Sequence, residues 1–228
     1  DSISYQGQVT DVSHGRTLEQ ASWSLFGEPT PGLSNDTPIC STTHISSNIE
    51  FSLDPGFYDS PQTIELFSDD PIYYTLDGTT PGSNDIFYID PILINNTTVL
   101  KARSIGINKL PSQTEVSTYF ISEQNYLPTI SLTAKPETLW DEEIGIYENE
   151  YKQREIPVTI EYFTSDNHYQ FTANLGARLG GENIWTKPQK PFTIYARNRF
   201  GQDYIDYQLF KNKACLLYTS DAADEHGC

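Results

Sequence analysis

Residues 49–121 contain short β-prone runs at even spacing, and this pattern constrains the fold more than any other feature of the chain. The runs are residues 49–53, 63–67, 72–76, 92–94, 99–105 and 114–121. Gly, Pro, Asn and Asp separate them, and several show alternating apolar and polar positions. Short strands broken by regular turn signals are typical of an Ig-like β-sandwich. We therefore predict a mainly β protein in which residues 48–121 form an Ig-like domain.

The pair Asp77-Gly78 follows the run at residues 72–76 and is itself followed by a second polar stretch. Asp-Gly supplies the positive φ that a tight hairpin needs, so we expect it at a hairpin tip. The alternation of side chains along each run predicts that Leu66, Tyr74 and Leu100 point into the sandwich. An independent domain of this size is expected to unfold cooperatively.

Three stretches of this region resemble one known family. They are Pro55-Gly56-Phe57-Tyr58, residues 72–81 (IYYTLDGTTP) and residues 97–103 (TTVLKAR). They are similar to the chitobiase/β-hexosaminidase C-terminal-type domain. The resemblance implies a rigid Ig-like spacer that accompanies extracellular enzymes. Four tyrosines, Tyr58, Tyr73, Tyr74 and Tyr88, offer faces for glycan stacking, but strands are rich in Tyr without any ligand, so core packing is the favoured interpretation.

A second β-rich region covers residues 127–213. Strands are predicted at residues 129–133, 156–163 and 169–175, with a polar joint at residues 122–125 before them. Pro136 followed by acids predicts the start of a short helix. The acids Asp141-Glu142-Glu143 lack the alternating spacing of a calcium loop, and we interpret them as solvated side chains near a helix N-terminus.

The segment at residues 174–210 carries the best candidate binding site. A run ends near Gly176 and Arg178, glycines follow, and a lysine precedes the strand at residues 192–197. Glycine backbone N–H groups and cations between two strands suit an anion, so we predict convergence on one open face. The candidate cofactor-binding residues are Arg178, Gly180, Gly181 and Lys190. The alternative is that both cations are strand residues paired with acids such as Asp203 or Asp206.

The same region resembles the CotH (spore-coat protein H) kinase-like family. The matching stretches are residues 128–132 (PTISL), 139–147 (LWDEEIGIY), 154–163 (REIPVTIEYF) and the block at residues 174–210. The resemblance implies the N-terminal part of a truncated α+β kinase-like domain at residues 127–213, with Arg178 and Lys190 facing ATP. Gly180, Glu182 and Pro191 depart from the family pattern.

For the parent protein the CotH resemblance implies an extracytoplasmic kinase that uses ATP and Mg to phosphorylate Ser or Thr of a protein substrate. No residue of this chain is assigned a catalytic role and no metal ligands are assigned, so the chain by itself is expected to be inactive and to hold no cofactor. The alternative is a non-enzymatic surface or spore-coat scaffold, or a carbohydrate-binding adhesion module. Its partners would be coat or surface proteins, and glycans.

Both ends of the chain read differently from its middle. Residues 1–35 resemble the C-terminal end of a lamin-tail domain, through DSISY at residues 1–5, SHGR at 13–16 and TPGLSN at 30–35, and residues 36–47 form a linker. Residues 215–228 resemble the translation of a sequencing adapter, so we expect this tail to pack against nothing and the gene to be an environmental fragment.

Composition limits the partners. The formal net charge is −17, and −14 without the three acids of residues 215–228, which repels nucleic acid and anionic lipid. No apolar run approaches the roughly 18 residues of a membrane span. Cys40 is the one cysteine outside residues 215–228, which argues against disulfides and cysteine-based metal sites. These features suit a secreted, soluble β-protein, and the family resemblances imply an extracellular or cell-surface location in a bacterium.

Overall fold

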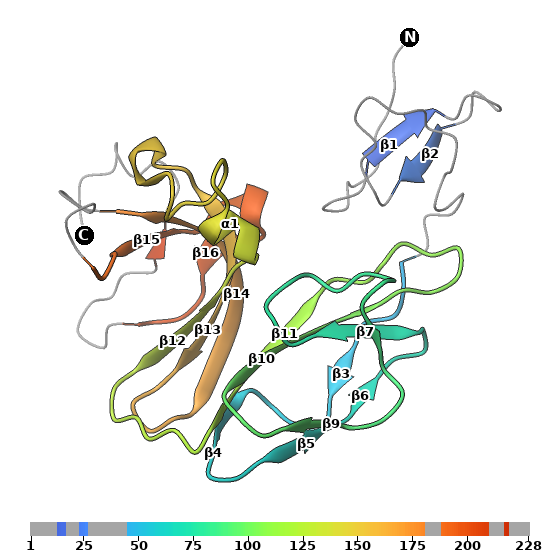
Figure 1. Cartoon of the computed structure of the whole chain (residues 1–228), viewed down its shortest axis with the longest axis horizontal. Helices are drawn as coiled ribbons and strands as arrows, with labels where there is room; N and C mark the ends of the chain where they lie inside the picture. The colour runs from blue at the N-terminus through green and yellow to red at the C-terminus, as the bar shows by residue number, and fades with distance from the viewer. Residues whose placement is uncertain (1–12, 17–22, 27–44, 181–187, 210–216, 219–228) are drawn as a thin grey trace.

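The computed structural model describes residues 13–16, 23–26, 45–180, 188–209 and 217–218 (Figure 1). The described chain is mainly β, as predicted. It contains an Ig-like-type sheet domain and a curled sheet of four strands. Within the described residues, α1 (Pro136–Trp140) is the one α-helix, and no helix there is long and apolar enough to cross a membrane.

A five-stranded sheet forms the larger layer of the Ig-like domain. Across the sheet its strands are β4 (Gly56–Tyr58), β11 (Glu115–Ile121), β10 (Thr98–Ser104), β7 (Ile72–Thr75) and β8 (Ile86–Phe87). Four short strands form two antiparallel pairs, β3 (Glu50–Phe51) with β6 (Leu66–Phe67) and β5 (Gln62–Ile64) with β9 (Ile92–Ile94). β4 pairs with β11 in parallel, and the other neighbours in the five-stranded sheet are antiparallel.

One apolar core joins these strands. Leu100 and Leu66 are buried, and Tyr74 is half-buried against the same core, so their predicted inward orientation is confirmed. Ile64, Ile94 and Tyr119 complete its centre at 1% exposure or less. Because alternate residues of β10 and β11 point to opposite faces, Leu100 and Tyr119 enter the core, while Lys101 and Thr118 lie on the other face, where they are also buried.

The connection at Asp77-Gly78 differs from the prediction. Gly78 has the expected positive φ of 84°. However, β7 pairs with β8, with Tyr74 opposite Ile86, so the connection is a ten-residue loop at residues 76–85 and not a tight hairpin. The edge strands β4 and β8 were not predicted, because two or three residues carry no detectable periodicity.

The second sheet is antiparallel, with the order β12 (Thr129–Thr133), β13 (Ile156–Phe163), β14 (Tyr169–Leu179) and β15 (Phe192–Tyr195). The predicted strands at residues 129–133 and 156–163 are confirmed, and β14 runs four residues beyond its predicted end. Figure 1 shows the long strand β14 curving alongside β13, with which it pairs. α1 starts at Pro136 as predicted.

The second sheet has a core face and an outer face. The core face carries alternate residues of β13 and β14, among them Val158, Ile160, Leu175, Ala177 and Leu179. Ile146 and Leu139, from the α1 segment, cover this face. The outer face carries the intervening positions, such as Glu161, Gly176 and Arg178, and it is the outer face that presents the polar and charged side chains.

The described parts of the two ends are short. β1 (Ser13–Arg16) and β2 (Trp23–Phe26) form an antiparallel hairpin within the region that resembles a lamin tail. In the tail, β17 (Leu217–Tyr218) pairs with β16 (Tyr204–Ile205), so the expectation that residues 215–228 pack against nothing is wrong for these two residues. The rest of that tail lies outside the described residues.

Candidate functional site

Lys190 forms an ion pair and is largely enclosed. Its Nζ lies 2.7 Å from Glu150 Oε1, and the two side chains are 12% and 18% exposed. Glu150 belongs to η1 (Glu150–Lys152), a 3₁₀ turn that follows the segment covering the core face. Glu150 Oε2 is buried with no hydrogen-bond partner in the described part of the chain. Lys190 is thus paired with an acid that the sequence did not single out.

Arg178 lies on the outer face. It is paired in register with Thr193, and its guanidinium carbon lies 5.2 Å from the centroid of the Tyr195 ring. Its Nε is buried without a hydrogen-bond partner among the described residues. Since Leu179 and Phe192, the next register pair, pack in the core, Arg178 points away from the side where Lys190 meets Glu150.

The predicted convergence of Arg178 and Lys190 on one open face is therefore wrong. The physical reason is that the period of two along β14 puts Arg178 on the outer face, whereas Lys190, which precedes β15, is held by Glu150. Gly180 N–H donates to Pro191 O at 2.9 Å, and a Cβ at Gly180 would collide with Thr193 Oγ1. Gly181 lies outside the described residues, so a glycine cradle for an anion stays a prediction.

The acids at residues 141–143 follow α1 instead of preceding it. Asp141 is the C-cap residue, and its Oδ1 accepts hydrogen bonds from the N–H groups of Glu143 and Ile144 at 2.8 and 3.0 Å. These bonds hold the pKa of Asp141 below its ordinary value. The interpretation as acids at a helix N-terminus is wrong: Asp141 shapes the turn. No group of three metal-ligating side chains occurs among the described residues.

A cluster of basic residues that sequence reasoning missed lies where β15 ends. Glu155 Oε1 is 3.3 Å from an Arg197 nitrogen, and Glu155 Oε2 contacts Arg199. The Arg197 guanidinium carbon lies 4.8 Å from the centroid of Tyr195, the ring that Arg178 also approaches. The available signal was the alternation Arg197-Asn198-Arg199 in a strongly acidic chain.

Three phenylalanines join the Ig-like domain to the second sheet. Phe163 of β13 is fully buried, and its ring meets Phe57 and Phe120 edge-on at centroid distances of 5.7 and 5.5 Å. Phe57 and Phe120 stack on each other at 4.3 Å. Edge-to-face and offset ring pairs stabilise a contact beyond the burial of their area. The joint is therefore an extension of the apolar packing of both parts.

Glu161 lies beside these rings at 1% exposure. Its Oε1 accepts a hydrogen bond from the Thr118 N–H at 3.0 Å, and its Oε2 contacts Thr118 Oγ1, which is 2.7 Å from Ser131 Oγ. Burial raises the pKa of Glu161 to about 7, although both bonds from Thr118 oppose the rise. A polar network thus crosses between β11 and β13 inside the joint.

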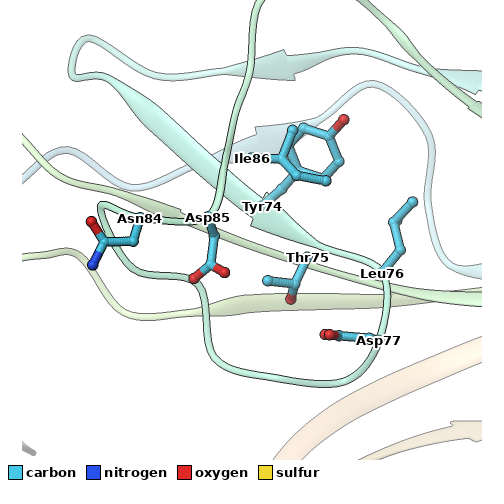
Figure 2. A pocket seen from close by; sticks show the side chains of 7 residues that line it. All are labelled: Tyr74, Thr75, Leu76, Asp77, Asn84, Asp85 and Ile86. Carbon is cyan, nitrogen blue, oxygen red and sulfur yellow. The ribbon is translucent and has the colours of Figure 1, made fainter.

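An open cleft of about 550 Å³ lies on the Ig-like domain, beside the loop at residues 76–85 (Figure 2). Its lining residues are Tyr74, Thr75, Leu76, Asp77, Asn84, Asp85 and Ile86. The acids mainly shape the loop: Asp77 Oδ1 accepts from Thr79 N–H at 3.0 Å, and Asp85 Oδ2 accepts from Gly82 N–H at 2.7 Å. The other carboxylate oxygens, Asp77 Oδ2 and Asp85 Oδ1, do not take part in these two hydrogen bonds.

The tyrosines considered for glycan stacking are used mostly for packing. Tyr58, Tyr74 and Tyr88 are half-buried against the core of the Ig-like domain. Tyr58 Oη donates to Asp54 O at 2.6 Å, and Tyr88 Oη accepts from Leu66 N–H at 3.1 Å. Tyr73 lies 5.4 Å from Phe87 across the β7–β8 pair. This arrangement favours the packing interpretation over a stacked glycan platform.

Comparisons with known proteins single out one part of the chain. No curated protein and no solved structure matches the chain significantly. No match covers the regions that resemble a lamin tail or CotH, so those resemblances stay predictions from the residues. Residues 53–118 match the family model of the chitobiase/beta-hexosaminidase C-terminal domain. The chain therefore contains an Ig-like module of this type, which is common in secreted carbohydrate-active or surface proteins.

Proposed function

We propose that this chain is a rigid, non-catalytic positioning unit of a secreted or cell-surface protein, in which the Ig-like module holds the second sheet at a fixed angle. The observation that carries the proposal is the joint between the two parts. Phe163 is fully buried against Phe57 and Phe120, and Glu161 bridges to Thr118 beside them. Neighbouring domains with small polar interfaces move freely, whereas an apolar interface with internal hydrogen bonds resists motion.

The connection between the two parts supports the same conclusion. β11 ends at Ile121 and β12 begins at Thr129, so seven residues join the sheets. Gly78 of the 76–85 loop approaches the backbone of Ala134, which lies just before α1. Contacts at β4, β11 and this loop restrict rotation about several axes at once.

A distance measurement tests the rigid unit. Spin labels at exposed Asn95 of the Ig-like domain and Glu142 of the second part, with the native cysteines replaced by Ser, should give one narrow distance distribution. Phe163→Ala should broaden it, because the aromatic contact is removed. An Ile130→Ala variant, which truncates an exposed apolar side chain of the same sheet, is the matched control. A broad distance distribution in the labelled protein that retains Phe163 would refute the proposal.

A second candidate function is nucleotide-dependent phosphoryl transfer by a longer protein that carries this chain. The resemblance to CotH motivates it, and one observation favours it: Lys190 is held by Glu150 at 2.7 Å in a largely enclosed ion pair. Protein kinases orient a phosphate-binding lysine through such a pair with a glutamate. ATP and Mg would be the cofactors, and a protein carrying Ser or Thr the substrate.

Calorimetry with ATP and Mg on the longer protein tests this candidate. Measurable affinity that Lys190→Ala weakens would support it. If Lys190→Ala leaves the affinity for ATP unchanged, Lys190 is not part of the site. A second observation separates a kinase from a scaffold: a kinase needs paired Asp residues suited to Mg²⁺ in the part of the longer protein that follows this chain.

A further inference from the structure

The outer face of the second sheet carries a concentration of positive charge that neither proposed function uses. Arg178 and Arg197 lie over the Tyr195 ring, and Arg199 is linked to Arg197 through Glu155. We call Arg178, Tyr195, Arg197 and Arg199 the arginine strip. Glu155 is the one acid that the structure pairs with the strip in the described part of the chain. Three guanidinium groups and one carboxylate leave an excess of positive charge on a chain whose formal charge is −17. Such a local reversal of sign attracts anions.

The strip already holds a carboxylate. One oxygen of Glu155 meets Arg197 at 3.3 Å, and the other meets Arg199. Arg197 and Arg199 remain 37% and 58% exposed, so both retain donors that face solvent. A guanidinium has five N–H donors and binds carboxylates through two of them, so one shared carboxylate does not exhaust this pair.

Arg178 adds a donor without a partner. Its Nε is buried and makes no hydrogen bond among the described residues, while its guanidinium lies over the Tyr195 ring. A buried, unpaired N–H of a charged group is costly unless a partner arrives. Together with the Arg197 guanidinium over the same ring, it makes the strip a preformed set of planar donors.

We propose that the arginine strip binds carboxylate groups of an acidic polysaccharide, with Glu155 occupying one carboxylate position when no ligand is bound. The carboxylate in contact with Arg197 and Arg199 identifies the chemistry. The Ig-like module, of a type common in carbohydrate-active and surface proteins, favours a glycan over an acidic peptide. This inference does not depend on the rigid joint or on nucleotide binding.

Titration calorimetry of the full chain tests the proposal, with a hexameric galacturonate as the probe. The Arg197→Gln/Arg199→Gln variant should lose about tenfold in affinity. Glu155→Gln should bind more tightly, because it frees both arginines. Arg178 stays unchanged because its half-buried side chain contributes to folding. The matched control is Lys152→Gln/Arg154→Gln, which removes the same charge from two exposed residues, one in η1 and one just after it.

Two further ligands separate charge from sugar and glycan from peptide. The fully methyl-esterified hexamer has the same sugars without charge and should not bind, while hexaglutamate, with equal charge, should bind more weakly than the galacturonate. Equal binding of the ester or of hexaglutamate overturns the assignment to a carboxylate-bearing glycan. The proposal is also overturned if both double variants lose the same affinity for the galacturonate hexamer, or if the unaltered chain does not bind the hexamer. Thermal unfolding of each variant confirms that the fold is retained.

Discussion

Replacing Glu161 by Gln should remove a pH dependence that the joint between the two parts imposes on stability. Glu161 is buried between β11 and β13, and burial raises its pKa from 4.5 to about 7. Gln has nearly the same shape. Its Oε1 can accept from the Thr118 N–H, and its Nε2 can donate to Thr118 Oγ1, which then donates to Ser131. The substitution therefore removes the titration while retaining both contacts.

The sign and size follow from the shift in pKa. The folded chain holds the Glu161 proton more tightly than the unfolded chain, so this group favours folding below pH 4.5. The contribution of Glu161 to the free energy of unfolding falls as the pH rises from 4.5 toward 7, and it does not change further above pH 7. A rise from 4.5 to about 7 corresponds to about 3 kcal/mol in the free energy of unfolding. Glu161→Gln should therefore gain about 3 kcal/mol relative to wild type between pH 4 and pH 8.

Urea unfolding, followed by tryptophan fluorescence at several pH values, measures this difference. Other groups titrate in both proteins and cancel in the comparison, including Glu115, whose pKa burial also raises. Glu142→Gln, which changes an exposed carboxylate, should show no comparable trend. Parallel stability curves for wild type and Glu161→Gln would refute the reasoning, because they would mean that folding does not raise the pKa of Glu161.

Three other predictions concern single residues. Phe163→Ala should destabilise the chain by about 3–5 kcal/mol in urea unfolding, because it empties a fully buried site between two other rings. A cost below about 1 kcal/mol would contradict the rigid joint. Gly78→Ala should lower the free energy of unfolding by about 1 kcal/mol because φ is 84° there, whereas Gly82→Ala, without positive φ, should cost less. Equal costs would argue against the strained loop. In a longer protein that binds ATP, Lys190→Ala should weaken binding by about one to two orders of magnitude in calorimetry, as expected for a lost charged hydrogen bond. Unchanged affinity would leave Lys190 a structural partner of Glu150.

Local patterns predicted the elements well where they were long enough to repeat. The alternation in residues 129–133 and 156–163 corresponds to β12 and β13, and Pro136 marks the start of α1. The motif residues at 53–118 identified the Ig-like module, which the family comparison confirmed. The short strands β4 and β8 escaped prediction because two or three residues show no periodicity, and β4 in addition pairs with the distant strand β11. Asp141 was misplaced because α1 is only one turn long and ends before it.

The sequence by itself determined the longer strands, such as β12 and β13, and the Ig-like module, because alternation and turn chemistry act over a few neighbouring residues. The tertiary structure decided which side chains meet. It placed Arg178 and Lys190 on opposite sides of one sheet, buried Glu161 and Phe163 against a domain more than 40 residues earlier, and gathered Arg197 and Arg199 on Glu155. Such encounters depend on strand register and on contacts distant in sequence, which no local pattern contains.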